Sequence, residues 1–292
     1  MKPLEGKVAV VAGATRGCGR GIAVALGEAG ATVYGTGRST RGNPSPMRRP
    51  ETIEETAERV SAAGGRGIAV RVDHTVASEV EALFARVRRE QGRLDILVND
   101  VWGGDDLAEW GKPFWEQSLE KGLLMLTQAV HSHVITSRFG VPLMIEGGAG
   151  LVVEVTDGDS PRYRGNFFYD LVKASVIRLA VGMAGDFAER NLDGLTAVAI
   201  TPGFLRSEYM LDHFGVREEN WRDAVAKDPH FAESETPALI GRTVAALAAD
   251  PRAHERAGHV LASWNLALEY GIVDADGRRP DWGAYAKRTF GW

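Results

Sequence analysis

The sequence predicts an α/β fold, a single doubly wound domain in which a seven-stranded parallel sheet carries helices on both faces. Short apolar runs rich in β-branched residues alternate with segments of helical pattern along almost all of the 292 residues. The runs have no regular polar alternation, as is typical of parallel strands buried on both faces. Because no internal repeat divides the chain, we expect one domain with right-handed connections between strands.

The expected strands are short, and a helical pattern follows each of the first six. The strands are Val8–Ala12, Thr32–Thr36, Gly67–Val72, Leu94–Val98, Leu151–Val155, Thr196–Ile200 and Gly258–Leu261. The helical patterns are Gly19–Ala29, Glu51–Ala63, Ala77–Gln91, Pro113–Phe139, Asn166–Arg190 and Thr236–Ala249.

Two long stretches depart from this alternation. Residues 203–235 form a mixed segment that we expect to be a small helical flap, since long loops in compact domains are usually functional. The last stretch is rich in aromatic residues. We therefore divide the chain into a main domain at 1–262, which includes the flap, and an extension at 263–292 that packs on the domain or on a neighbouring subunit.

Composition and charge argue against several classes of protein. The formal net charge of −5 gives no electrostatic basis for binding nucleic acid or an anionic membrane. No apolar run approaches the length of a membrane span, and no signal-like segment precedes the first strand. We expect a cytoplasmic protein without nucleic-acid or membrane partners.

The sequence predicts no metal site. Cys18 is the only cysteine, which excludes a cysteine-based metal cluster and a disulfide within the chain. His131 and His133 stand two residues apart on an expected helix, so their side chains face different directions and are unsuited to share one ion.

A glycine-rich turn follows the first strand and predicts a dinucleotide site. Gly13, Gly17 and Gly19 lie between the strand and a helix, with Thr15 and Arg16 in the same turn. Glycines permit a tight turn, and backbone N–H groups at a helix N-terminus bind a pyrophosphate. This arrangement indicates a Rossmann-type domain.

Tyr169 and Lys173 form a second candidate site. They are four residues apart on an expected helix, so they share one face. A lysine ammonium near a phenol favours the phenolate and should lower the pKa of Tyr169. Tyr169 then suits proton transfer with a carbonyl compound and its alcohol.

These residues resemble the classical short-chain dehydrogenase/reductase family over about residues 5 to 262. The motifs that carry the resemblance stand in the family's order along the chain. They are the glycine turn, Asp73, Leu97–Asn99, Tyr169 with Lys173, and Pro202–Gly203. The resemblance implies a nicotinamide nucleotide, with Tyr169 as general acid or base and Lys173 on the ribose hydroxyls.

The resemblance also gives roles to other residues. Asp73 matches the residue that meets the adenine amino group, and Asn99 matches the brace behind the nucleotide. Pro202 and Gly203 match the turn beside the nicotinamide. The family further implies a homodimer or homotetramer built on the two longest helices and the last strand.

Arg38 favours NADP(H) over NAD(H). It stands just past the second strand, where an NAD-preferring fold usually has a carboxylate for the ribose hydroxyls. A guanidinium binds a 2′-phosphate through charge-assisted hydrogen bonds. Arg16 favours the same nucleotide by resemblance. The alternative is that both are solvated surface arginines.

The family's catalytic serine, 12 or 13 residues before the tyrosine, is missing. Thr156 and Asp157 occupy those two positions, and Ser160 is a third candidate. Thr156 would keep a hydroxyl that orients the substrate oxygen. An ionised Asp157 would repel a forming alkoxide, so it would have to be protonated or act as a base.

Two more departures lie near the same site. The family's asparagine on the fourth helix is absent, and Gly122, Leu119 or Thr127 takes its place. Trp102 is bulky where the backbone should pass close to the nicotinamide ribose. These changes reshape the substrate pocket or mark altered chemistry.

The sequence therefore leaves three hypotheses for function. The first is an NADPH-dependent reductase of a ketone or aldehyde that uses Tyr169 and Lys173. The second is a dehydratase, isomerase or cyclase with Asp157 and Tyr169 as an acid–base pair. The third is a catalytically silent nucleotide-binding protein. Aromatic residues favour an apolar carbonyl substrate, and the candidates for its pocket are Trp102, Trp110, Phe114, Phe168, Tyr209 and Trp221. Packing in the core explains most of these residues equally well.

Overall fold

The computed structural model describes residues 2–44, 47–160 and 162–291. Residue 1, the start of the expected main domain, and residue 292, the end of the expected extension, lie outside the described residues. Seven strands form one parallel sheet in the order β3-β2-β1-β4-β5-β6-β7. The strands are β1 (Val8–Ala12), β2 (Thr32–Gly37), β3 (Arg66–Arg71), β4 (Ile96–Asn99), β5 (Gly150–Val155), β6 (Leu195–Thr201) and β7 (Val260–Ala262). The expected α/β fold is confirmed.

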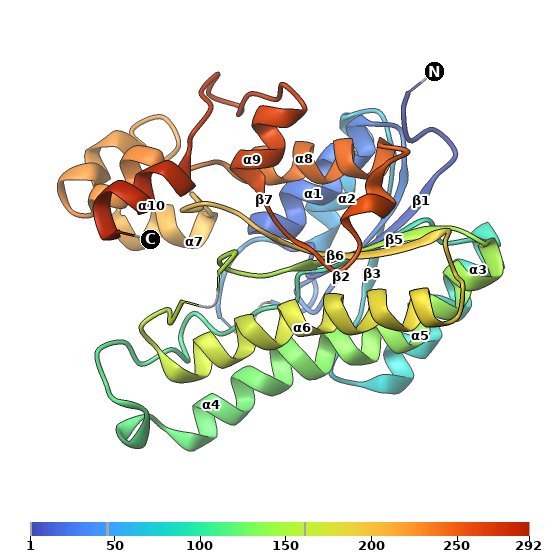
Figure 1. Cartoon of the computed structure of the whole chain (residues 1–292), viewed down its shortest axis with the longest axis horizontal. Coiled ribbons are helices and arrows are strands. Elements are labelled where there is room, and N and C mark those ends of the chain that lie inside the picture. Colours follow the sequence, from blue (N-terminus) through green and yellow to red (C-terminus); the bar gives the residue numbers. More distant parts are fainter. Residues whose placement is uncertain (1, 45–46, 161, 292) are drawn as a thin grey trace.

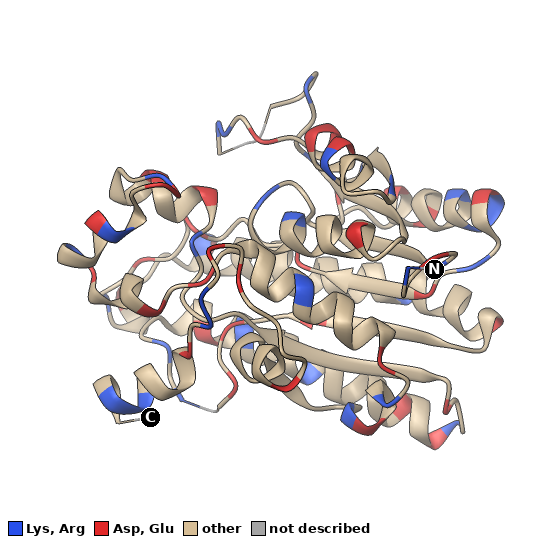
Figure 2. Ribbon diagram, turned by 90° about the horizontal axis from the view of Figure 1, so that it is seen from above, with Lys and Arg blue, Asp and Glu red and all other residues tan. Residues whose placement is uncertain are grey.

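Helices cover both faces of the sheet (Figure 1). One face carries α1 (Gly17–Glu28), α2 (Ile53–Ala62), α8 (Pro237–Ala249) and α9 (Ser263–Glu269); the other carries α3 (Ala77–Gln91), α4 (Leu119–Leu126), α5 (Ser132–Gly147) and α6 (Phe167–Glu189). Each face has its own apolar core. Charged residues of both signs lie mainly on helices and loops, and the strands carry very few of them (Figure 2).

The fourth helical segment differs from its prediction. The expected single helix Pro113–Phe139 begins only at Leu119, where the Ser118 hydroxyl accepts a hydrogen bond from the Lys121 N–H. A five-residue π-helical turn, Thr127–His131, interrupts it before α5. α5 then continues through Pro142 to Gly147. A proline often ends a helix, which explains the early predicted end.

The flap and the C-terminal segment pack on each other. The flap contains α7 (Glu208–Phe214) and two short 3-10 helices, and it encloses a small core around Trp221 and Phe231. The last helix, α10 (Trp282–Phe290), lies against it, with the Trp282 ring 5.9 Å from that of Phe204 and 5.6 Å from that of His230. Figure 1 shows α10 beside α7, away from the sheet. None of the helices over the described ranges is long and apolar enough to span a membrane.

Candidate active site

A cavity of about 1420 Å³ opens at the carboxyl ends of the strands. Residues that follow each of the seven strands line it, because parallel strands end at one edge of the sheet. The flap and α10 provide its remaining wall. Of the predicted site residues, those that line it are Gly13, Thr15, Arg16, Gly17, Arg38, Asp73, Thr156, Asp157, Tyr169, Lys173, Pro202 and Gly203. Gly19 and Asn99 are not among its lining residues.

Two of the three glycines in the turn, Gly13 and Gly19, are packed so closely that a side chain cannot replace their hydrogens. Gly13 has φ +89°, and a Cβ there would lie 2.3 Å from the Asp100 carbonyl oxygen. A Cβ on Gly19 would lie 2.3 Å from the Gly13 carbonyl oxygen. Gly19 therefore shapes the turn from behind without lining the cavity. The turn fits the backbone cradle that a dinucleotide pyrophosphate needs.

A carboxylate already binds at this helix N-terminus. The Gly17 N–H donates to Oε2 of Glu208 at 2.8 Å, and Arg20 lies 3.4 Å from the other oxygen. Glu208 comes from α7 of the flap and thus shows that the first turn of α1 accepts anionic oxygen. The sequence analysis did not identify Glu208 as a site residue. Its position five residues after Gly203 was the signal that could have indicated it.

Asp100 lies at the end of β4 against the same turn. The Gly19 N–H donates a hydrogen bond to its carboxylate, yet burial raises the pKa of Asp100 to about 7. The nearby Lys173 opposes this shift. At neutral pH this carboxyl group is therefore part protonated and part charged.

The arginines expected at the adenosine end both line the cavity. Arg38 lies 3.8 Å from the Asp73 carboxylate, so the predicted phosphate-binding and adenine-binding residues meet. Burial would raise the pKa of Asp73, but hydrogen bonds from Thr75 and the charge of Arg38 give a net lowering. Arg16 donates to the Met47 sulfur at 2.7 Å.

Asn99 belongs to a buried polar network beneath the cavity. Its amide nitrogen donates to Ser137 at 2.9 Å and to Glu154 at 2.7 Å. The other Glu154 oxygen lies 2.7 Å from Nδ1 of His133, and both of these side chains are almost completely buried. His133 thus ties α5 to β5, and Asn99 ties β4 to the same network.

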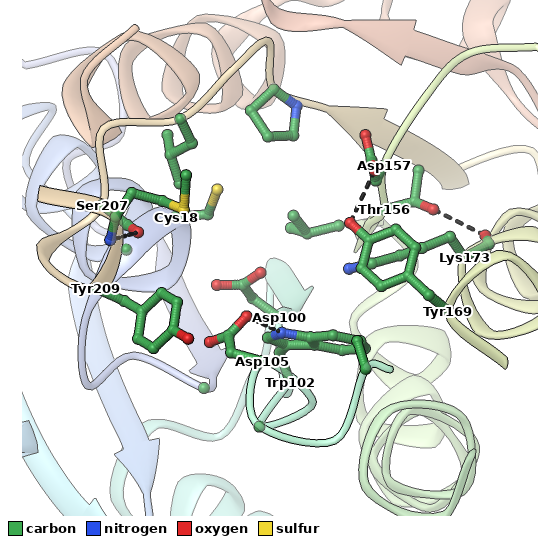
Figure 3. A pocket seen from close by; sticks show the side chains of 18 of the residues that line it. Cys18, Asp100, Trp102, Asp105, Thr156, Asp157, Tyr169, Lys173, Ser207 and Tyr209 are labelled. Carbon is green, nitrogen blue, oxygen red and sulfur yellow. Dashed lines mark hydrogen bonds between the residues drawn. The ribbon is translucent and has the colours of Figure 1, made fainter. Parts of the chain in front are cut away.

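Asp157, not Thr156, contacts the Tyr169 hydroxyl. Tyr169 donates to Oδ2 of Asp157 at 2.8 Å (Figure 3). Thr156 is turned away, and its hydroxyl donates to the Lys173 carbonyl oxygen at 2.8 Å. Ser160 is exposed, and its carbonyl oxygen accepts from Arg164. Of the three candidates for the serine position, Asp157 is therefore the one that lies next to the phenol.

The pKa of Tyr169 shifts opposite to the expected direction. Burial and the Asp157 carboxylate raise the pKa of Tyr169 well above its ordinary value. Lys173 has its Nζ 4.3 Å from the centre of the Trp102 ring and 5.4 Å from that of Tyr169. The ammonium thus stacks on Trp102, and in this arrangement the phenol keeps its proton.

The helix that lacks the family asparagine presents other residues to the cavity. Gly122 packs against the Phe168 ring, Leu119 is exposed, and the Thr127 hydroxyl donates to the Leu123 carbonyl oxygen. Leu124 and Gln128 line the cavity instead, and the buried Gln128 side-chain oxygen has no hydrogen-bond partner among the described residues. The sequence analysis did not identify Gln128.

Three of the six expected aromatic residues line the cavity. Trp102 and Trp110 both contact the Tyr169 ring, with ring centres 5.4 and 5.2 Å away. Tyr209 lies on the flap side. Phe114, Phe168 and Trp221 do not line it, so the prediction for them was wrong; Trp221 is buried in the flap core.

Comparison with known proteins gives a consistent family. The short chain dehydrogenase family model matches residues 7–214. Dehydrogenase/reductase SDR family member 1 of Mus musculus is 37% identical over 283 residues, which cover 95% of this chain and 86% of the relative. Hydroxynaphthalene reductase arp2 of Aspergillus fumigatus is 28% identical over 242 residues, which cover 82% and 80%.

Solved structures share the fold. A Xanthomonas campestris dehydrogenase structure aligns with a TM-score of 0.75 at 24% identity, covering 95% of this chain and 94% of that one. A Beutenbergia cavernae structure, named for an NAD(P)-dependent gluconate 5-dehydrogenase and containing NADP, gives 0.70 at 26% identity, with 89% and 96% covered.

The parallel sheet, the glycine turn and the neighbouring tyrosine and lysine define a class of nucleotide-dependent oxidoreductases. The chain belongs to the short-chain dehydrogenase family, and it is similar to dehydrogenase/reductase SDR family member 1 over nearly its whole length. Stretches such as Gly30–Tyr34 and Tyr270–Arg278 favour the same subgroup.

Proposed function

We propose that this protein is an NADP(H)-preferring oxidoreductase that interconverts a ketone or aldehyde and its alcohol. The observation that carries the proposal is one cavity with the glycine turn at one end and Tyr169 with Lys173 at the other. When bound, the nicotinamide ring supplies or accepts the hydride. The protein's side chains hold the nucleotide and move the proton.

Each part of the cavity has a proposed task. The turn Gly13–Gly19 and the N-terminus of α1 bind the pyrophosphate, and Arg38 with Arg16 binds the 2′-phosphate. Asp73 meets the adenine amino group, while the Pro202–Gly203 turn binds the carboxamide and Asn99 supports the end of β4. These assignments follow from the resemblance and from the positions described above.

Tyr169 transfers the proton in this proposal. In reduction its hydroxyl donates to the substrate oxygen, and Lys173 binds the ribose hydroxyls beside it. The phenol is protonated at neutral pH, as a proton donor must be, although burial and Asp157 also make it a weaker acid. Asp157 orients the phenol through the hydrogen bond of 2.8 Å.

The Tyr169–Asp157 hydrogen bond also favours a second candidate function. A carboxylate near 4 Å from a developing alkoxide costs about 4 kcal/mol at an effective dielectric constant of about 20. An acid–base pair without net hydride transfer avoids this repulsion. A dehydratase, isomerase or cyclase is therefore the alternative, and turnover without a net change in nicotinamide absorbance would identify it.

Replacing Tyr169 with phenylalanine tests the proton donor. The phenylalanine variant keeps the ring contacts with Trp102 and Trp110 but lacks the hydroxyl. We expect carbonyl reduction to fall by about 10²- to 10⁴-fold, with NADP⁺ affinity unchanged by calorimetry. Unchanged turnover would refute the role of Tyr169. Nucleotide binding by the parent protein without turnover on a broad carbonyl panel would favour a silent binding protein.

Replacing Arg38 with alanine tests the nucleotide preference. A charge-assisted hydrogen bond contributes about 1.5–3 kcal/mol, so we expect NADP⁺ affinity to fall by at least about tenfold while NAD⁺ affinity stays the same. Arg41→Ala is the matched control, because Arg41 pairs with Glu58 and does not line the cavity. Equal losses for both nucleotides would contradict the proposed 2′-phosphate site.

A further inference from the structure

We propose that the substrate carries a cationic nitrogen on the carbon next to its reacting carbonyl, so that the protein interconverts α-amino ketones and amino alcohols. The inference rests on the proposed oxidoreductase function and adds the substrate class. Asp157 is the counter-ion of that nitrogen. Trp110 and Tyr169 place aromatic rings beside it.

The first argument is the charge of Asp157 beside the proton donor. Its Oδ2 accepts from the Tyr169 hydroxyl at 2.8 Å, so a substrate oxygen bound to Tyr169 comes close to a carboxylate. A neutral ketone would develop its negative charge next to that carboxylate, and the cations on this side, Lys173 and Arg164, already contact the Trp102 ring and the Asp170 carboxylate. A neighbouring ammonium attracts both the carboxylate and the developing alkoxide, which removes the mismatch.

The spacing of the two groups fits this substrate. In an α-amino ketone the oxygen and the nitrogen stand on adjacent carbons, so two side chains that touch each other can take one each. Tyr169 binds the oxygen and Asp157 the nitrogen. Figure 3 shows Asp157 and the Lys173 ammonium on different sides of the Tyr169 hydroxyl.

The aromatic rings support the same charge. Cations bind over the faces of tryptophan and tyrosine, and aromatic cages recognise quaternary ammonium groups. The Lys173 ammonium already occupies the Trp102 ring at 4.3 Å. Trp110 contacts the Tyr169 ring at 5.2 Å and is 57% exposed, so it offers a further face to a ligand.

Several carboxylates line this end of the cavity together with cations. Asp105, which accepts from the Trp102 indole N–H at 2.7 Å, and Asp100 are shown with Tyr169 in Figure 3. Asp106 and Asp159 also line the cavity. Of the lining cations, Arg16 and Arg38 lie at the proposed adenosine end, and the others are Lys173, Arg162, Arg164 and Lys287.

The proposed reaction balances without a further reactant. In reduction, hydride from the nucleotide adds to the carbonyl carbon, and the π electrons move to the oxygen. The oxygen takes the Tyr169 proton, and water restores it. The nitrogen keeps its charge, the carbonyl is reduced to an alcohol, and the nucleotide is oxidised.

Calorimetry with a matched pair of ketones tests the substrate class. The probes are phenacyltrimethylammonium and its neutral carbon isostere, neopentyl phenyl ketone, titrated into protein saturated with NADP⁺, which cannot reduce them. We expect the cation to bind at least tenfold more tightly. Asp157→Asn should bring this ratio close to one, and Trp110→Leu should lower it by about two- to fivefold.

The controls separate this inference from the proposed function. Asp193→Asn removes an exposed carboxylate that does not line the cavity and should keep the ratio, and Asp157→Ser gives a second test if Asp157→Asn no longer binds NADP⁺. Equal binding of both ketones, or a ratio that survives Asp157→Asn, would overturn the inference. If the protein reduces the neutral ketone and shows no preference for the cation, the proposed oxidoreductase function stands and the cationic substrate class is refuted. Charge-selective binding without NADPH turnover of either ketone would overturn carbonyl reduction only.

Discussion

Asp100 is the residue whose environment most directly couples the site to pH. It lies against the glycine turn, and burial raises the pKa of Asp100 to about 7. Below that pH the carboxyl group is neutral, and above it a negative charge stands next to the proposed pyrophosphate site. Affinity for an anionic nucleotide should therefore fall as the pH rises through 7.

Replacing Asp100 with asparagine should remove this dependence. We expect the variant to bind NADP⁺ more tightly than the parent at pH 8.5, on the order of tenfold, and about equally at pH 5.5. Calorimetry across this range measures the NADP⁺ affinity of both proteins. Titration of the nucleotide itself affects both affinities equally, so it cancels in their ratio. If the ratio of the two NADP⁺ affinities does not change with pH, the prediction that Asp100 titrates in this range is wrong.

At the scale of elements, α7 is the segment most directly linked to nucleotide binding. Its Glu208 carboxylate accepts from the Gly17 N–H at 2.8 Å, where the phosphates are proposed to bind. A nucleotide must displace this carboxylate, and the first turn of α7 must move with it. Glu208 of the flap and the phosphates of the nucleotide thus compete for the same backbone N–H groups of the glycine turn.

Glu208→Gln should consequently strengthen nucleotide binding. An anion at a helix N-terminus is stabilised by about 0.3–2 kcal/mol, so we expect NADP⁺ affinity to rise by about two- to thirtyfold. Glu219→Gln, on the exposed surface of the same flap, is the matched control. Weaker binding in Glu208→Gln would mean that Glu208 supports the bound nucleotide.

At the scale of the whole molecule, α4 and α6 leave an apolar surface uncovered. Leu119 is 65% exposed and Leu123 52% on α4, and Phe167 is 39% and Leu171 40% exposed on α6, which contacts α4. Large exposed apolar patches commonly mark protein interfaces. We propose that it forms the dimer contact that the family resemblance implies.

Leu123→Arg should separate the subunits. The introduced charge would be buried in the proposed contact, so we expect sedimentation to give half the parent mass. Val273→Arg, at an exposed apolar position far along the chain, should leave the assembly intact. A monomeric parent protein would refute the proposal.

The fold was predictable because its signals are local, whereas the site depends on contacts between distant segments. β1 matches its predicted bounds, and the other strand boundaries shift by no more than two residues. The glycine turn and Tyr169 with Lys173 were also recognisable from spacing. Neither Glu208 against Gly17 nor Asp157 on Tyr169 follows from periodicity, because these contacts depend on how loops pack.

The position of α10 has a practical consequence for any assay of this protein. Lys287 and Phe290, in its last turns, line the cavity. A purification tag fused directly after them would begin at the cavity mouth and could compete with a ligand. Figure 1 places the amino-terminal end on another side of the molecule, away from α10. Amino-terminal fusions are therefore the appropriate form for every measurement proposed above.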